Sequence, residues 1–118
     1  MLHPVARTIA QPPINAFESA EEAWFWFVRC QQVRREGAQL AGGGMFSRPC
    51  DPDDIYRAIM GLRRRGVVGA VHLTVLARFG LIGRPPDPRC ADEAQPAQWW
   101  GEALDRLGTV LRDKGIID

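Results

Sequence analysis

Hydrophobic positions recur at three- and four-residue spacing in four stretches of the chain, a pattern that predicts four helices separated by polar or glycine-rich segments. The predicted spans are 20–37, 52–65, 70–79 and 96–115. No stretch alternates convincingly as a strand would. We therefore predict an all-α fold: a small orthogonal bundle of about four helices, with residues 17–118 as a single helical domain and residues 1–16 as a flexible tail.

The ends of the predicted helices carry clear capping signals. Ser19 is followed three residues later by Glu22, and this spacing predicts a capping box in which Glu22 reaches back to the cap. Asp51 as N-cap and Pro52 in the first turn begin the second helix. Gly80 is expected to end the third helix in the left-handed conformation.

The apolar positions of each predicted helix define the expected core. The second helix presents Ile55, Ala58, Ile59 and Leu62; the third presents Val71, Val75, Leu76 and Phe79, with Leu73 off the stripe; and the fourth presents Trp100, Ala103, Leu104, Leu107, Val110 and Leu111. Ile116 and Ile117 are expected to fold back as a hydrophobic clasp. Four consecutive aromatic residues, Trp24 to Phe27, cannot share one helical face, so the first helix is either central to the core or partly exposed to a partner.

Two segments between the helices are predicted to be irregular. Gly42, Gly43 and Gly44 form a flexible connection that lacks the Lys and Ser/Thr of a phosphate-binding loop. Residues 83–89 are rich in proline and arginine and form a stiff connection without regular structure.

The charges are unevenly distributed, although the 118-residue chain carries a net charge of only +1. The segment from Arg29 to Arg89 holds eleven arginines against five acidic residues, and the flanking segments carry the compensating acid. This distribution is compatible with a surface that faces a polyanion. The alternative is a solvated surface whose charges pair within the fold.

No motif in the sequence points to catalysis or to a metal site. Cys30, Cys50 and Cys90 are widely spaced, which argues against a disulfide framework or a zinc ribbon and favours free thiols in a reducing cytoplasm. His3 and His72 lie in no recognisable catalytic setting. The sequence shows no membrane-spanning run and no signal-peptide pattern. We therefore expect a cytoplasmic protein without enzyme activity, cofactor, metal or membrane partner.

The second and third predicted helices meet at a joint that holds Arg63, Arg64 and Arg65 just before Gly66. Two short helices joined by a turn near a glycine, with basic charge at the joint, suggest a helix-turn-helix that could approach DNA. Arg65, however, stands where the generic motif expects an apolar residue. The same arginines also offset the negative end of the helix dipole without any ligand.

The segment Leu76-Ala77-Arg78-Phe79-Gly80-Leu81 resembles the Leu-x-x-Arg-Phe/Tyr-Gly-Leu segment of sigma-factor region 4. In that family the segment precedes a helix-turn-helix that recognises promoter DNA, so the resemblance implies a role in transcription. The sequence departs from the family at the proline-rich residues 83–88, and no recognition helix can be carried over. The pattern from Trp100 to Gly115 is also similar to that of small bacterial and prophage-borne proteins.

The leading prediction is a small DNA-binding protein of bacterial or phage type that acts as a transcriptional regulator. Its predicted DNA-binding residues are Arg63, Arg64, Arg65, His72, Thr74, Arg78 and Arg84. The alternative is a helical adaptor that binds RNA polymerase or another bacterial machine through an aromatic and arginine surface. A third interpretation is a homodimer with no nucleic-acid role.

Overall fold

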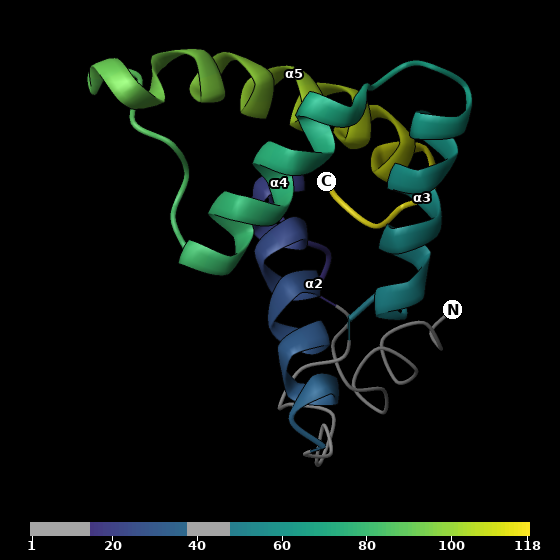
Figure 1. Ribbon diagram of the computed structural model, residues 1–118. Coiled ribbons are helices and arrows are strands. Elements are labelled where there is room, and N and C mark those ends of the chain that lie inside the picture. Colours follow the sequence, from purple (N-terminus) through teal and green to yellow (C-terminus); the bar gives the residue numbers. More distant parts are fainter. Residues whose placement is uncertain (1–14, 38–47) are drawn as a thin grey trace, which may run out of the picture.

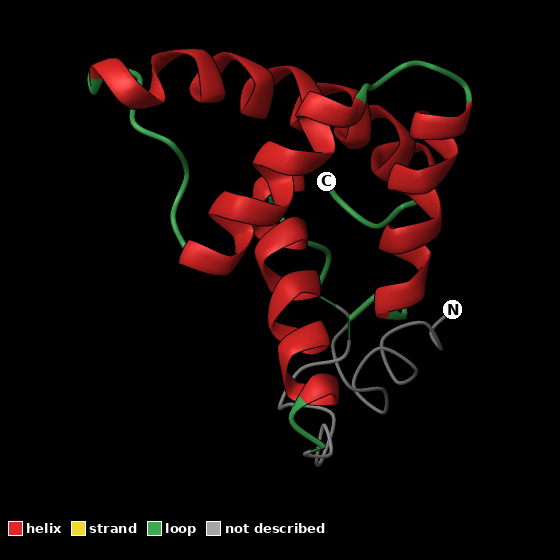
Figure 2. Cartoon of the chain, in the orientation of Figure 1, coloured by secondary structure: helices red, strands yellow, loops and turns green. Residues whose placement is uncertain are grey.

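The computed structural model describes residues 15–37 and 48–118, which fold as α-helices joined by short loops (Figures 1 and 2). The elements are α2 (Ala20–Arg35), α3 (Pro52–Arg64), α4 (Ala70–Ile82), a short 3-10 helix η2 (Ala91–Glu93) and α5 (Ala94–Asp113). Figure 1 shows α5 lying across one end of the molecule, with the other three helices running away from it. The all-α prediction is confirmed. Most of the predicted tail and the glycine segment 42–44 lie outside the described residues.

The N-terminal caps of α2 and α3 form largely as the sequence predicts. The Ser19 hydroxyl accepts a hydrogen bond from the Glu22 N–H at 3.1 Å, whereas the Glu22 carboxylate accepts from the Glu18 N–H at 2.7 Å rather than from Ser19 itself. In α3 the box is reciprocal: the Asp51 carboxylate accepts from the Asp53 N–H, and the Asp54 carboxylate accepts from the Asp51 N–H. These bonds satisfy backbone donors that the first helical turn leaves without partners.

The core is one continuous cluster drawn from all four long helices. In the aromatic run of α2, Trp24 and Phe27 are 6% and 7% exposed, and Phe25 and Trp26 are partly buried against the core, so the run is largely core. Trp100 of α5 is 5% exposed. Each of these indole N–H groups finds an acceptor: Trp24 donates to the Leu76 carbonyl and Trp100 donates to the Glu21 carboxylate, both at 2.9 Å. Burial of both rings is therefore achieved without an unsatisfied polar group.

Helix α4 ends later than predicted and buries a different set of residues. It continues through Gly80 to Ile82, and Gly83 takes the left-handed conformation (φ 89°) that was expected at Gly80. Gly80 lies inside the helix because α4 approaches α2 very closely there: a Cβ on Gly80 would lie 2.8 Å from Val28 Cγ2. Val71, predicted to be buried, is 45% exposed, whereas Leu73 packs against the core.

Helix α5 and the residues after it close the fold. The helix begins at Ala94, two residues before the predicted start at Pro96, and Gly115 ends it with a φ of 76°. The predicted clasp is confirmed, since Ile116 and Ile117 are 3% and 4% exposed. The chain end also pairs with Phe17, whose N–H donates to the Ile116 carbonyl and whose carbonyl accepts from the Asp118 N–H.

The consecutive helices α3 and α4 hardly touch one another. The five-residue connection between them contains Gly66 in the left-handed conformation, as a tight turn requires, but each helix packs on α2 and α5 instead of on its neighbour. In Figure 1 the two helices lie apart after they leave the connection. The helix-turn-helix at this connection stays a prediction. The structure shows α3 and α4 packed mainly on α2 and α5, which hold the two helices in one core.

None of the described helices combines the length and the apolar character needed to cross a bilayer.

Candidate interaction groove

An apolar groove of about 330 Å³ opens between α3 and α4, with α2 as its floor. Residues from all three helices line it: Trp24, Phe27, Val28, Gln31, Gln32, Arg35, Tyr56, Ile59, Met60, Leu73, Ala77 and Leu81. We call this surface the α3–α4 groove. It exists because α3 and α4 both pack on α2 but not on each other.

The walls of the groove are apolar residues that stand beside the buried stripes of their helices. On α4, Leu73, Ala77 and Leu81 follow one another at four-residue spacing and so share a face. On α3, Tyr56 and Met60 have the same relation, and the Tyr56 ring stacks at 6.4 Å from the Phe27 ring of the floor. Tyr56 and Leu81 remain 52% and 55% exposed, which leaves a wide apolar surface open to solvent.

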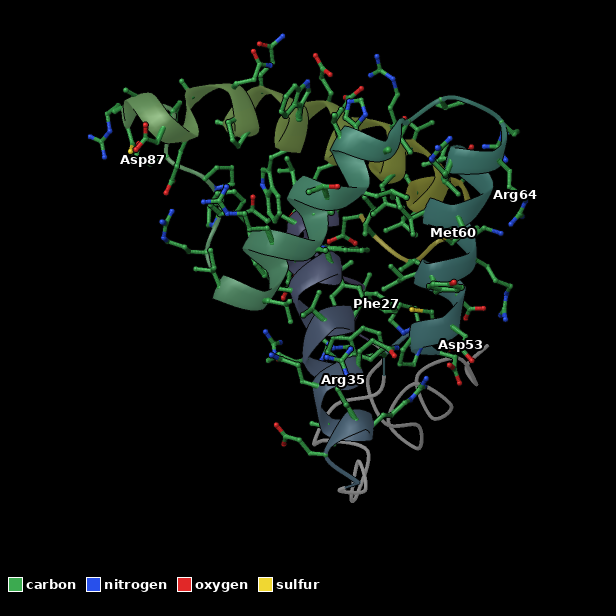
Figure 3. All side chains as sticks on the ribbon, viewed as in Figure 1. Phe27, Arg35, Asp53, Met60, Arg64 and Asp87 are labelled. Atoms are coloured by element: carbon green, nitrogen blue, oxygen red, sulfur yellow. The ribbon has the colours of Figure 1, made fainter. Side chains whose placement is uncertain are left out.

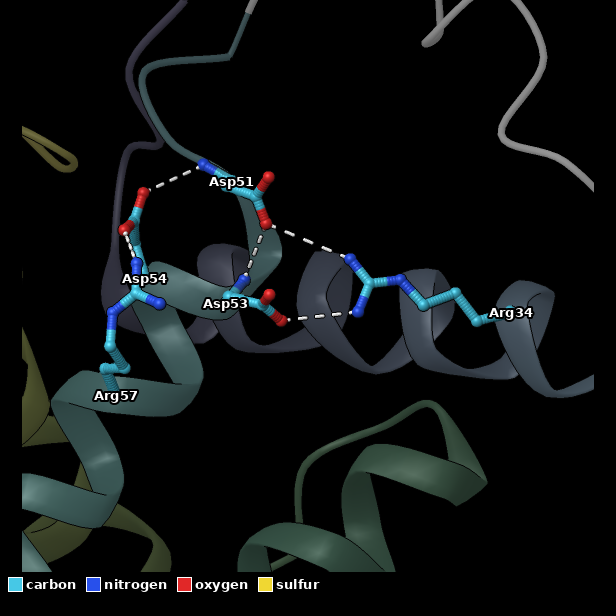
Figure 4. A network of polar contacts seen from close by, with 5 residues as sticks. All are labelled: Arg34, Asp51, Asp53, Asp54 and Arg57. Carbon is cyan, nitrogen blue, oxygen red and sulfur yellow. Dashed lines mark hydrogen bonds and ion pairs between the residues drawn. The ribbon is translucent and has the colours of Figure 1, made fainter.

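The single charged side chain that lines the groove among the described residues is Arg35, which is basic. Helix α4 carries one arginine and no acidic residue. The acidic residues of the α3 N-terminus are already engaged. The Arg34 guanidinium lies 3.8 Å from the Asp51 carboxylate and 3.3 Å from the Asp53 carboxylate. Arg57 is paired with Asp54, and Figure 4 shows these contacts together.

The three consecutive arginines lie at the C-terminal end of α3 and are exposed, as predicted. Within residues 15–37 and 48–118, no acidic side chain pairs with Arg63, Arg64 or Arg65. Arg64 and Arg65 line a second, smaller hollow between α3 and the end of α5, and Arg63 does not.

His72 is engaged within the fold rather than turned toward solvent. Its Nδ1 accepts a hydrogen bond from the Gly69 N–H at 2.9 Å, which places the ring proton on Nε2, and Nε2 donates to the Glu102 carboxylate at 2.9 Å. The hydrogen bond from His72, followed by that from Gln98, lowers the pKa of Glu102. His72 thus caps α4 and ties it to α5. The neighbouring Thr74 is exposed and donates to the Ala70 carbonyl, as a threonine inside a helix commonly does.

The remaining predicted DNA contacts lie on another part of the molecule. Arg78 is exposed and lies over the Phe79 ring at 4.9 Å. Arg84 forms two hydrogen bonds, at 2.8 and 2.7 Å, with the Glu93 carboxylate. These bonds, with a further bond from the Asp87 N–H, lower the pKa of Glu93 to about 2.

The seven predicted DNA-binding residues do not form one surface. Figure 3 shows Arg64 and Asp87 at opposite sides of the molecule, and Arg84 borders the same surface recess as Asp87. The arginine triplet and Arg84 are therefore far apart. This separation arises because α5 spans the distance between the end of α3 and the 83–93 loop.

Comparison with known proteins finds no matching family model, no matching curated protein and no matching solved structure.

The resemblance of Leu76–Leu81 to sigma-factor region 4 stays a prediction. Within the part of the chain that the structure describes, no cluster of His, Cys, Asp or Glu could hold a metal ion. The sequence signal for the groove is a set of apolar positions outside the predicted core stripes of the second and third helices: Tyr56, Met60 and Leu81. What the sequence could not supply was the distance between the two helices that carry them.

Proposed function

We propose that this protein is a helical interaction module whose α3–α4 groove binds an amphipathic helix of another protein, one that carries acidic residues beside its apolar face. The observation that carries the proposal is the groove itself, which three different helices line. Its two walls are apolar, and its floor on α2 combines Trp24, Phe27 and Val28 with Gln31, Gln32 and Arg35. A helix that lays its apolar face into such a groove is a common mode of recognition between proteins.

The one charge at the groove favours an acidic partner. Arg35 borders the floor, and among the described residues no Asp or Glu lines the groove. A second copy of this chain would bring a second Arg35 toward the first, so the charges oppose a symmetric dimer through this face. Covering the exposed parts of Tyr56 and Leu81 would contribute about 1 kcal/mol each from apolar burial.

Site-specific photo-crosslinking tests this function. A photoreactive phenylalanine analogue at Leu81 is expected to crosslink, in cells that express the protein, to a segment of another protein with an apolar face and flanking acidic residues. The same analogue at Arg106, on the exposed side of α5 and outside the groove, is the matched control. Mass spectrometry of the crosslinked peptide identifies the segment.

The affinity of the parent protein and its variants for that segment, made as a synthetic peptide, is then measured. Leu81→Glu is expected to weaken binding at least roughly tenfold, because it places a carboxylate in an apolar wall next to an acidic ligand. Arg106→Gln should leave the affinity unchanged. The proposal fails if Leu81 crosslinks no more than Arg106, if it crosslinks to a second copy, or if the peptide binds the Leu81→Glu variant as tightly as the parent.

DNA binding remains a second candidate, supported by one observation. Arg63, Arg64 and Arg65 are exposed together at the end of α3 and have no acidic partner among the described residues. Fluorescence anisotropy with mixed duplex DNA at low salt is expected to show binding that weakens steeply as salt is added. A triple alanine variant of these arginines that binds as well as the parent would exclude this role. The cytoplasmic location belongs to both proposals, and the free thiols Cys30 and Cys50 are compatible with it.

A further inference from the structure

A notch of about 320 Å³ lies between the C-terminal half of α3 and the C-terminal end of α5. Its lining residues are Asp54, Arg57, Ala58, Gly61, Arg64, Arg65, Val110 and Lys114. Four cationic side chains thus surround it against one carboxylate. This notch is separate from the α3–α4 groove, since the two share no lining residue.

Two guanidinium groups converge over Gly61, which has no side chain to separate them. From the point that a Cβ on Gly61 would occupy, Arg65 Nη1 is 3.4 Å away and Arg64 Nη2 is 3.9 Å away. The backbone of Gly61 is buried beneath these side chains. Two like charges brought to the same space repel one another unless an anion lies between them.

No acidic side chain of the described residues fills that position. The Asp54 carboxylate is paired with Arg57, and in the described part of the chain no acidic group pairs with Arg64, Arg65 or Lys114. Basic residues at a helix C-terminus do offset its dipole. That effect explains why arginines occur here, but it does not require two of them to share one space.

We propose that the notch binds a compact diphosphate group, either as free pyrophosphate or as part of a nucleotide. Arginine forks match phosphate oxygens in pairs. Arg64 and Arg65 converge on one point and Lys114 lines the same notch, whereas an extended nucleic-acid strand would follow a line of charges. The space is that of about ten water molecules, which leaves room for such a group.

Isothermal titration calorimetry at constant ionic strength tests the proposal, with sodium pyrophosphate, ADP and inorganic phosphate as the probes. Pyrophosphate is expected to bind the parent protein, and Arg64→Gln and Arg65→Gln should each weaken its binding by roughly tenfold through the loss of charge-assisted hydrogen bonds. Arg63→Gln is the matched control: the substitution removes the same charge, and the neighbouring Arg63 lies outside the notch. Circular dichroism checks that every variant is folded.

A further variant distinguishes binding in the notch from general electrostatic attraction of the anion to the basic surface. Gly61→Leu keeps every charge but fills the space where the two guanidiniums meet, so it should abolish pyrophosphate binding; Gly61→Ala, whose added carbon makes only ordinary contacts, should weaken it less. Equal affinities for pyrophosphate and ADP would assign the site to the diphosphate itself, and tighter binding of ADP would assign it to a nucleotide. The proposal is overturned if neither binds, if Arg63→Gln weakens binding as much as Arg64→Gln, if Gly61→Leu has no effect, or if duplex DNA binds where pyrophosphate does not.

Discussion

Replacing Gly80 by alanine should destabilise the protein, although the same change inside a helix normally stabilises it. Relative to glycine, alanine favours a helix interior by about 1 kcal/mol. At Gly80, however, the new methyl carbon would lie 2.8 Å from Val28 Cγ2 and 2.9 Å from Trp24 Nε1, closer than real Cβ atoms approach their neighbours. Helix α4 or α2 would therefore have to shift.

The size of the effect follows from three contributions. Overpacking of this kind costs about 1–3 kcal/mol. The Trp24 N–H is displaced from the Leu76 carbonyl that it bonds at 2.9 Å, which costs about 1 kcal/mol more. The gain in helix propensity offsets about 1 kcal/mol, so the free energy of unfolding should fall by about 1–3 kcal/mol.

Urea denaturation followed by tryptophan fluorescence and circular dichroism measures this change. Gly101→Ala in α5 is the matched control, because a Cβ there meets nothing within 4 Å, and it should raise the free energy of unfolding by up to about 1 kcal/mol. A Gly80→Ala variant at least as stable as the parent, beside a stabilised Gly101→Ala variant, would refute the close approach of α4 to α2.

Three further predictions concern polar and ionisable groups. The pKa of Glu93 is lowered to about 2, against an ordinary 4.5, so its ionised carboxylate stabilises the fold above about pH 4.5. This stabilisation is lost as the pH falls through about 2. Glu93→Gln should therefore lower the melting temperature at pH 7 and remove part of the loss of stability between pH 4.5 and 2. Burial, with the nearby Asp54 and Asp51 carboxylates, raises the pKa of Cys50 from 9.0 to about 11, so at pH 8 its thiolate fraction is roughly a hundredfold below that of an ordinary thiol. Mass spectrometry after iodoacetamide treatment should find exposed Cys90 modified well before Cys50, and equal rates would contradict the burial of Cys50. His72→Ala removes the cap of α4 and the tie to α5, and should cost about 1–2 kcal/mol in urea denaturation, whereas a neutral result would show that His72 has no structural role.

The starts of α2 and α3 could be predicted because their signals are local. Ser19, Asp51 and Pro52 act within one turn of their own position, so a single sequence carries all the information needed. The choice between Gly80 and Gly83 as the end of α4 is different. It depends on Trp24 and Val28, which reach Gly80 from a distant part of the chain.

The candidate groove lay beyond sequence reasoning for the same physical cause. Tyr56 and Leu81 were recognisable as apolar positions outside the main stripes, but their relation depends on how far α3 and α4 stand apart. The pairing of Arg84 also depends on tertiary structure. Its partner Glu93 is brought to it by the loop between α4 and α5, and a DNA contact by Arg84 stays a prediction. Predicted surfaces that combine several elements need the tertiary arrangement first.

The pairing of Phe17 with the chain end affects the order of events during synthesis. Phe17 is fully buried, and the residues that bond its backbone, Ile116 and Asp118, are the last of the region to leave the ribosome. Until they emerge, Phe17 and the adjoining aromatic face of α2 lack their cover. Closing this contact also requires the chain to bring distant segments together, which slows folding. The core is therefore completed only after residues 116–118 have been synthesised.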